Sequence, residues 1–368
     1  MKLKAHDWWL WLFLWLIMIN PTLALELRIA IEKGVNKVNV GTSTTATIMD
    51  EKGQILGELD PNTALDAKVN GKNISIGKWV KSEIWLQPKQ EQGLVWIGDR
   101  WYRGIIHLVN TKQKIIAVNQ VDLEQYLYSV LGAEMGKNWP IEALKAQSVA
   151  ARTYALYERQ KANKSQQLYD VSDTTSSQVY KGVQSESSNT QLAVDSTTGQ
   201  ILTYNGQVIL AVFHAASGGH TENVENVWSN KLPYLRGVPD YDQGTPGYQW
   251  VTNFSGQTLG NKLGVGNIIS IKPERMTESG RILTLIATGI NGTKRLPGTK
   301  VRQILGLRST LFTITPTSGG FEFQGKGYGH GLGLSQWGAY NLALEGVNYQ
   351  QILLHYYQGV QIMTIGDS

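Results

Sequence analysis

The sequence predicts an α+β protein in which mixed antiparallel sheets surround one central, buried helix. Three observations favour this class. Short alternating apolar runs separated by turn signals fill residues 27–121, an Ala-rich helical pattern follows at about 140–160, and strands alternate with loops after it. Alternation with a period of two is typical of antiparallel strands, and a helix that is apolar nearly all round is buried among other elements.

The first 24 residues are predicted to be a secretory signal peptide and not part of the fold. Lys2 and Lys4 precede an uninterrupted apolar run from Trp8 to Ile19, and Thr22-Leu23-Ala24 has small residues at the two positions that a signal peptidase reads. The alternative is an uncleaved membrane anchor, but the apolar run is shorter than the ~20 residues that span a hydrocarbon core. We therefore expect an exported protein, with membrane contact only through this segment if it is retained.

Composition narrows the classes of function. The chain has no cysteine, so disulfides and thiolate metal sites are excluded. Its net charge of +5 is spread out, without the run of Lys and Arg that marks a nucleic-acid surface, so we expect no nucleic-acid partner. A mildly basic exported protein suits an anionic polymer. No phosphate-binding or dinucleotide-binding glycine motif follows a strand, and we expect no cofactor.

The chain then divides into a β-rich N-terminal region, 25–120, and a second region, 121–368. In the first region Asn70-Gly71 separates two strand-like runs, and this pair is the strongest local signal for a hairpin. In the second region Asp122 is placed to cap a helix whose apolar residues, from Leu123 to Leu131, fall on one stripe, with Gly132 as its expected end.

A second helix is expected from about Pro140 to Gln160, because Pro is favoured near the first helical position. Lys145, Ser148 and Arg152 share one stripe of this otherwise apolar helix, so they need polar partners or a cavity to face.

The rest of the chain predicts loops and strands with short helices. Residues 169–241 read as loops and strands, and residues 253–314 as strands with a hairpin at Ser279-Gly280 and a helix near 299–305. Two last helices are expected at 334–344 and 349–357, each followed by a glycine.

Glu134 is the best candidate for a catalytic acid. It lies between the two predicted helices, flanked by Ala133 and Met135 and followed closely by Trp139. Such apolar neighbours favour the protonated form of a carboxyl group, which a general acid requires. The alternative is that Glu134 caps the next helix or pairs with a basic residue, Arg152 or Lys145.

A glycine-rich motif near the C-terminus predicts a second wall of the same site. Glycines at every second position from 325 to 333 would leave backbone bare for a ligand, and Tyr328, His330, Gln336 and Trp337 offer aromatic faces and hydrogen bonds for a sugar ring. The alternative is tight packing of the glycines against protein.

Three histidines are weak candidates for metal ligands: His214, His220 and His330. They lack the helical i, i+4 spacing of a zinc pair, so hydrogen-bonded histidines are the alternative.

Six motifs stand in order along the chain: VDLEQYLYSVLGAEMGKNWPIEALKAQSVAARTYAL, SDTTSSQVYKG, FHAASGGHTENVENVW, KLPYLRGV, LPGTKVRQILGLRST and GKGYGHGLGLSQWGAYNLALEG. With them the chain resembles the stage II sporulation protein D and amidase enhancer family from about Trp101 to Val360. The resemblance implies a lytic transglycosylase in the periplasm or cell wall that cleaves the glycan strands of peptidoglycan. It also implies that residues 121–368 form the glycan-cleaving domain, and that Glu134, in an Ala-Glu-Met motif, acts first as acid and then as base.

The same motifs carry the candidate substrate-binding residues: Lys145, Arg152, Gln178, Tyr180, His214, Tyr328, His330, Ser335, Gln336 and Trp337. Asp173 and Glu222 are further candidates for a helping carboxylate. Some relatives carry Cys, His and Cys within the segment that matches residues 172–177 and bind zinc there. This chain has serine at all three positions, so we predict no metal.

The family name leaves a second function open, that of a non-catalytic peptidoglycan-binding protein that stimulates a cell-wall amidase. Both functions require a glycan groove, but only the enzyme requires Glu134.

Overall fold

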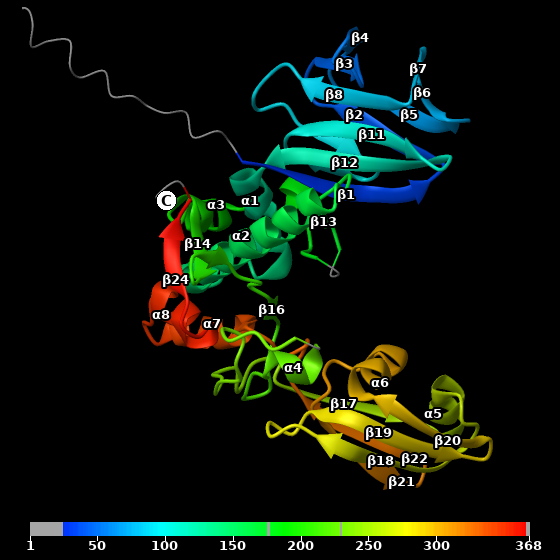
Figure 1. Ribbon diagram of the computed structural model, residues 1–368, viewed down its shortest axis with the longest axis vertical. Coiled ribbons are helices and arrows are strands. Elements are labelled where there is room, and N and C mark those ends of the chain that lie inside the picture. The colour runs from blue at the N-terminus through cyan, green and yellow to red at the C-terminus, as the bar shows by residue number, and fades with distance from the viewer. Residues whose placement is uncertain (1–24, 175–176, 229, 366–368) are drawn as a thin grey trace, which may run out of the picture.

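The computed structural model describes residues 25–174, 177–228 and 230–365, so the predicted signal peptide lies outside the described residues. Helices and strands are both abundant, and most strands pair antiparallel in several sheets (Figure 1), which confirms the predicted α+β class. Within the described ranges, no helix is both long and apolar enough to cross a membrane.

The N-terminal region consists of two sheets that share one core. The first sheet has the strand order β13 (Val171–Ser172), β1 (Glu26–Val35), β12 (Lys114–Asp122), β11 (Ile105–Thr111), β8 (Glu83–Pro88), β3 (Ala46–Asp50) and β4 (Ile55–Leu59). The second has the order β10 (Arg100–Tyr102), β9 (Val95–Ile97), β2 (Lys37–Thr42), β5 (Thr63–Asn70), β6 (Asn73–Ile76) and β7 (Trp79–Lys81).

Alternating burial along these strands explains why the two sheets pack together. Ile29, Ile84 and Ile106 from the first sheet and Val40 and Ile97 from the second are fully buried in one cluster. Each such side chain contributes roughly 1.5–3 kcal/mol relative to an exposed position. The predicted hairpin is also confirmed, because β5 pairs antiparallel with β6 around the Asn70-Gly71 turn.

A helical layer follows, with α2 at its centre. Its elements are α1 (Leu123–Glu134), α2 (Ile141–Lys164), the 3-10 turn η1 (Gly182–Ser185), α3 (Ser188–Asp195), β14 (Gln200–Tyr204), β15 (Gln207–Val208), β16 (Phe213–His214), α4 (Val224–Val227), β23 (Leu334–Ser335), α7 (Gln336–Leu344), α8 (Tyr349–Tyr356) and β24 (Gln361–Thr364). The helix α2 contacts α1, α3, α7, α8 and β14, so it is buried among other elements as predicted.

The boundaries of α1 and α2 differ from the prediction. Asp122 caps α1 as expected, since its carboxylate accepts hydrogen bonds from the backbone N–H groups of Glu124 and Gln125 at 2.9 and 3.1 Å. The helix nevertheless continues through Gly132 to Glu134. A Cβ atom at Gly132 would lie 1.8 Å from the carbonyl oxygen of Ser185, so this glycine permits close packing and does not end the helix.

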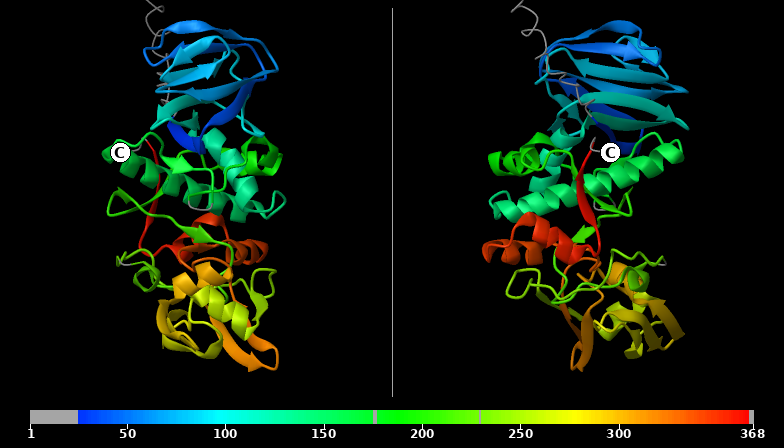
Figure 2. Two further views of the ribbon diagram at one scale, coloured as in Figure 1. Left: turned by 90° about the vertical axis from the view of Figure 1, so that its right-hand side faces the viewer. Right: turned by 60° about the vertical axis from the view of Figure 1, so that its left-hand side comes forward.

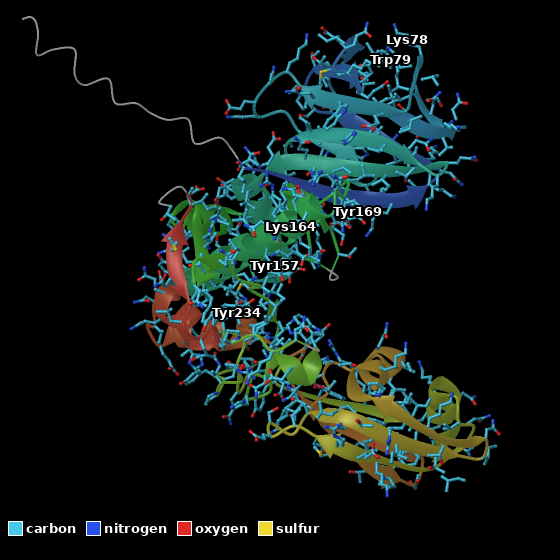
Figure 3. The ribbon with its side chains drawn as sticks, viewed as in Figure 1. Lys78, Trp79, Tyr157, Lys164, Tyr169 and Tyr234 are labelled. Carbon is cyan, nitrogen blue, oxygen red and sulfur yellow. The ribbon has the colours of Figure 1, made fainter. Side chains whose placement is uncertain are left out.

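The helix α2 extends four residues further than predicted, to Lys164, which Figure 3 labels in the middle layer together with Tyr157. The prediction of only loops and strands for 169–241 was wrong at η1, α3 and α4, and α3 is the longest of the three. The signal for α3 is a capping box, in which Ser187 and Thr190 each accept a hydrogen bond from the backbone N–H of the other.

An inserted domain, residues 249–326, leaves the helical layer and returns to it. Its elements are β17 (Gln249–Phe254), α5 (Gly256–Leu263), β18 (Ile268–Met276), β19 (Ile282–Gly289), β20 (Gly292–Pro297), α6 (Gly298–Leu305), β21 (Phe312–Thr317) and β22 (Gly320–Lys326). The predicted hairpin is β18–β19 and the predicted short helix is α6, whereas α5 was not anticipated.

The inserted domain has a hydrophobic core of its own. This second cluster includes Trp250, Leu259, Leu285, Val301 and Phe323, and it is separate from the cluster that runs from the N-terminal sheets into the helical layer. The two views in Figure 2 show the N-terminal sheets, the helical layer and the inserted domain in that order along the long axis. The domain boundary at residue 120 stays a prediction.

Candidate active site

Glu134 lies at a cleft of about 600 Å³ between the helical layer and the inserted domain. The cleft brings together five of the eleven predicted catalytic and substrate-binding residues: Glu134, His214, Tyr328, His330 and Gln336. The lining residues that were not predicted include Tyr154, Glu158, Trp228 and Arg302. Together they provide two carboxylates, one guanidinium and several aromatic faces.

The Glu134 carboxyl group is held by the segment that follows β13. As the last residue of α1, Glu134 accepts a hydrogen bond at Oε1 from the backbone N–H of Val179 at 2.7 Å. Burial raises the pKa of this carboxyl group, and the Val179 hydrogen bond, Gln336 and the charge of Lys181 oppose that rise. The net pKa is higher than that of an ordinary glutamate, so the protonated form is favoured relative to an exposed carboxyl.

Gln178 and Tyr180 flank Val179 and anchor it in the core. Gln178 accepts a hydrogen bond from the Tyr126 hydroxyl at 3.0 Å and donates one to the Ala151 carbonyl at 3.1 Å. The Tyr180 hydroxyl donates to Asn119 at 2.9 Å. Because protein groups bury both side chains, these residues position the donor to Glu134 and do not provide the predicted substrate contacts.

Arg152 and Lys145 do not face the cleft either. The Arg152 guanidinium is fully buried and pairs with Glu124, with Nε–Oε1 and Nη2–Oε2 distances of 2.8 and 2.5 Å. Lys145 pairs with Glu142 at 2.8 Å. Their polar partners therefore lie on the protein itself, and the alternative in which one of them pairs with Glu134 is wrong in this structure.

Most of the glycine-rich segment packs against protein, and Gly329 is the one glycine of its described residues that lines the cleft. Gly327 and Gly333 have φ angles of 79° and 64°. A Cβ atom there would lie 2.6 Å from the Ser217 carbonyl oxygen and 2.1 Å from that of Val212. Only glycine can therefore follow this path, and the path leaves Tyr328 49% exposed at the cleft.

His214 and His330 are neutral hydrogen-bonding groups with ring centroids 5.4 Å apart. Burial and the charge of Arg281 lower the pKa of His214 to about 3, and burial also lowers the pKa of His330 well below its usual value. His214 donates from Nδ1 to the Leu332 carbonyl at 3.0 Å, which leaves its buried Nε2 as an acceptor without a partner in the described part of the chain.

The third histidine, His220, is outside the cleft and contacts the carbonyl of Thr221 at 2.6 Å through Nδ1. Across residues 25–174, 177–228 and 230–365, no group of three or more His, Asp or Glu side chains is arranged to hold a metal ion. Residues 175 and 176, within the segment 172–177 on which the prediction of no metal rests, lie outside the described residues. The absence of zinc there stays a prediction.

Of the three neighbouring residues in the Ser-Gln-Trp motif, only Gln336 lines the cleft. Ser335 caps α7 by accepting a hydrogen bond from the Gly338 N–H at 3.3 Å. The Trp337 ring packs on Trp139 and Tyr340, with centroid distances of 4.5 and 5.2 Å. Ser335 and Trp337 are thus structural here, and the aromatic face expected from Trp337 is provided by other residues.

The second carboxylate of the cleft is Glu158, and not the predicted helpers. Glu222 accepts hydrogen bonds from Asn226 and Ser279 at 2.8 and 2.5 Å, away from the cleft, and Asp173 is also outside it. Glu158 and Tyr154 lie four residues apart on α2, so they share a face of the helix. That spacing was visible in the sequence and could have identified both.

Comparison with known proteins gives two matches to family models and several relatives. Residues 111–204 match the model described as stage II sporulation protein, and residues 248–333 match a domain of unknown function (DUF8618). An uncharacterized protein of Brachyspira hyodysenteriae is 36% identical over 267 residues, 71% of this chain and 72% of the relative. Stage II sporulation protein D of Bacillus subtilis is 36% identical over 263 residues, 67% of this chain and 76% of the relative.

The chain belongs to the stage II sporulation protein D family. A Bacillus subtilis protein named amidase enhancer is also similar, with 31% identity over 294 residues, 65% of this chain and 40% of the relative. The part that matches the sporulation protein model contains Glu134, Val179 and Glu158. Arg302 and Tyr328 belong to the second match, so in this member of the family the two matched parts form opposite walls of one cleft.

Proposed function

We propose that the protein is an exported lytic transglycosylase that cleaves peptidoglycan strands between N-acetylmuramic acid and N-acetylglucosamine. The observation that carries the proposal is Glu134, a carboxyl group with a raised pKa at a cleft of about 600 Å³. This volume lies within the roughly 300–1,000 Å³ typical of ligand sites. Trp228 and Tyr328, which are 40% and 49% exposed, supply aromatic faces on which sugar rings stack.

In the first step, protonated Glu134 donates its proton to the glycosidic oxygen. The bond between that oxygen and C1 of the muramyl residue breaks, the leaving sugar gains a hydroxyl group, and positive charge develops on the muramyl ring. A positioned general acid contributes a rate increase of roughly 10²–10⁴-fold. The Val179 N–H, already 2.7 Å from Oε1, stabilises the carboxylate that this step creates.

In the second step, the Glu134 carboxylate removes the proton of the muramyl C6 hydroxyl group. The C6 oxygen forms a bond to C1, which closes a 1,6-anhydro ring and returns Glu134 to its protonated form. No water is consumed. One carboxyl group serves both steps, whereas most glycosidases use two, one as acid and the other as nucleophile or base.

Glu158 makes a two-carboxylate hydrolase the natural competing chemistry, because it lines the same cleft. In α2 it forms an ion pair with Lys161 at 3.2 Å, one turn away. The two chemistries differ in their products, since a hydrolase adds water to C1 and leaves a reducing end.

A second candidate function is favoured by the relative named amidase enhancer. In this function the protein binds peptidoglycan without cleaving it and stimulates a cell-wall amidase. Both functions place the mature protein in the periplasm or cell wall, which is supported by the predicted signal peptide at residues 1–24.

The test is to digest purified glycan strands with residues 25–368 in water enriched in heavy oxygen and to weigh the new ends by mass spectrometry. We expect anhydromuramyl ends without heavy oxygen. Reducing ends that carry heavy oxygen would replace the transglycosylase by a hydrolase. Strands that are bound but uncut would favour the amidase-stimulating function.

A further inference from the structure

Two arginines of the inserted domain line a hollow beside the cleft, and one of them lines the cleft itself. Arg302, in the last turn of α6, lines both the Glu134 cleft and an adjoining hollow of about 370 Å³. Arg308 lines the same hollow, and Tyr328 lines both spaces. In Figure 1, α6 lies at the end of the inserted domain that faces the helical layer. The hollow is therefore continuous with the cleft at Arg302 and Tyr328.

Neither arginine is neutralised by the protein. Arg302 and Arg308 belong to no ion pair within the described ranges. By contrast, the buried guanidinium of Arg152 has a structural role and pairs with Glu124 through two contacts. Arg302 is partly buried without such a carboxylate, which is an unfavourable position for a cation that has no ligand.

The structural contacts of the two side chains leave most of their donors free. Arg302 donates from Nε to the Leu307 carbonyl at 3.3 Å, and among the described residues this is its one hydrogen-bond acceptor. The Arg308 guanidinium lies 5.6 Å from the centre of the Tyr328 ring, a contact that needs no hydrogen bond. Since each guanidinium has five N–H donors, the pair can still bind an anion in the hollow.

We propose that Arg302 and Arg308 form a carboxylate subsite, by which the inserted domain binds an acidic group of the glycan strand next to the bond that Glu134 cleaves. The inference rests on the proposed function, because it takes its ligand from a peptidoglycan strand. Sugar rings themselves carry no charge there, so the carboxylates are those of the muramyl lactyl group, free when no peptide is attached, and of the stem peptides. Arginine binds either one with two parallel hydrogen bonds.

The test measures strand binding by fluorescence anisotropy at low and high salt. All proteins carry Glu134→Gln, so that cleavage does not interfere with binding. Three labelled probes are compared: strands stripped of stem peptides, strands that keep them, and stripped strands whose carboxyl groups have been converted to neutral amides. The variants are Arg302→Gln/Arg308→Gln, the charge-preserving Arg302→Lys/Arg308→Lys, and Arg275→Gln, which removes an exposed arginine from the same domain away from the cleft.

We expect the double Gln variant to bind the acidic probe at least about tenfold more weakly, since charge-assisted hydrogen bonds are lost. Its affinity should also depend less on salt. The double Lys variant should keep part of the affinity, and Arg275→Gln all of it. Preference for the stripped probe identifies the lactyl carboxylate, and preference for the peptide-bearing probe identifies the stem carboxylates.

Equal affinity of the unsubstituted Arg302/Arg308 protein for the acidic and amidated probes would overturn the subsite, as would an unchanged affinity in the double Gln variant. Both results leave the proposed function standing when Glu134-dependent products are still found. Conversely, arginine-dependent binding without cleavage by the Glu134 protein would refute the transglycosylase and keep the subsite. Arg308 is exposed, so the single variant Arg308→Gln should fold normally. Circular dichroism of this variant therefore separates a loss of binding from a loss of folding.

Discussion

The two walls of the cleft are built in different ways. The wall that carries Glu134 belongs to the larger core, and buried hydrogen bonds fix it through Val179 and its neighbours Gln178 and Tyr180. The opposite wall includes Arg302, from a domain with a separate core. The comparison teaches that Glu134, the proposed reacting group, is held by buried hydrogen bonds of the larger core, whereas Arg302, the proposed recognition group, comes from a domain with its own core.

The largest difference between the walls should appear when matched arginines are removed. Arg152→Ala leaves the Glu124 carboxylate without its buried partner, and we expect about 3–5 kcal/mol lower free energy of unfolding. Arg302→Ala breaks no ion pair, so this substitution should lower the free energy of unfolding by less than about 1 kcal/mol. Urea unfolding followed by circular dichroism measures both, and equal losses would remove the distinction between a structural and a ligand-binding arginine.

Separate cores predict separate effects of core mutations. Leu285→Ala creates a cavity in the inserted domain and should lower the free energy of unfolding of that domain by about 2–4 kcal/mol. The matched Leu127→Ala should lower the free energy of unfolding of the part built on the larger core by a similar amount. Hydrogen exchange measured by mass spectrometry locates each loss. Increased exchange in α1 and α2 caused by Leu285→Ala would show that the two cores behave as one cooperative unit.

Loss of the hydrogen bonds of Gln178 should lower kcat as well as the free energy of unfolding. Gln178→Ala removes two buried hydrogen bonds and should lower the free energy of unfolding by about 1–3 kcal/mol. Because Val179 then no longer holds the Glu134 carboxylate in place, kcat should fall while KM changes little. A rise in KM with unchanged kcat would instead indicate that Gln178 contacts substrate after all.

The smallest expected effect is a pH dependence of stability. The pKa of Glu134 is raised in the folded protein, so its contribution to stability is fully present below the unfolded pKa and is lost as pH rises through the folded pKa. The glutamine side chain of Glu134→Gln is neutral at every pH. The variant should therefore be slightly more stable than the original protein at pH 7, and the two should be equally stable at pH 4. Thermal unfolding at both pH values checks this, and a variant that is less stable at pH 7 would contradict the direction of the shift.

The sequence predicted those features that depend on neighbours along the chain. The cap at Asp122, the turn at Asn70-Gly71 and the apolar surroundings of Glu134 are all local, and the structure has the first two as predicted. The prediction that Gly132 ends the helix was wrong. A glycine is required there because the helix lies close to Ser185, a residue distant in sequence.

Partners distant in sequence explain the remaining errors at the site. Arg152 looked like a ligand-binding residue because it is polar on an apolar helix, but its partner Glu124 is on another helix. Nothing near Val179 indicates that its N–H meets Glu134, and nothing near Arg302 indicates that α6 reaches the cleft. Such contacts follow from the packing of whole elements and not from local pattern.

The most direct test of the central claim compares Glu134→Gln with the matched Glu158→Gln, the other carboxylate of the cleft. Initial rates of anhydromuramyl formation are measured at saturating strand concentration, with strand binding measured in parallel. We predict that Glu134→Gln loses roughly 10²–10⁴-fold in rate and still binds strands, while Glu158→Gln loses less than about tenfold. Cleavage that survives in Glu134→Gln and disappears in Glu158→Gln would contradict the account.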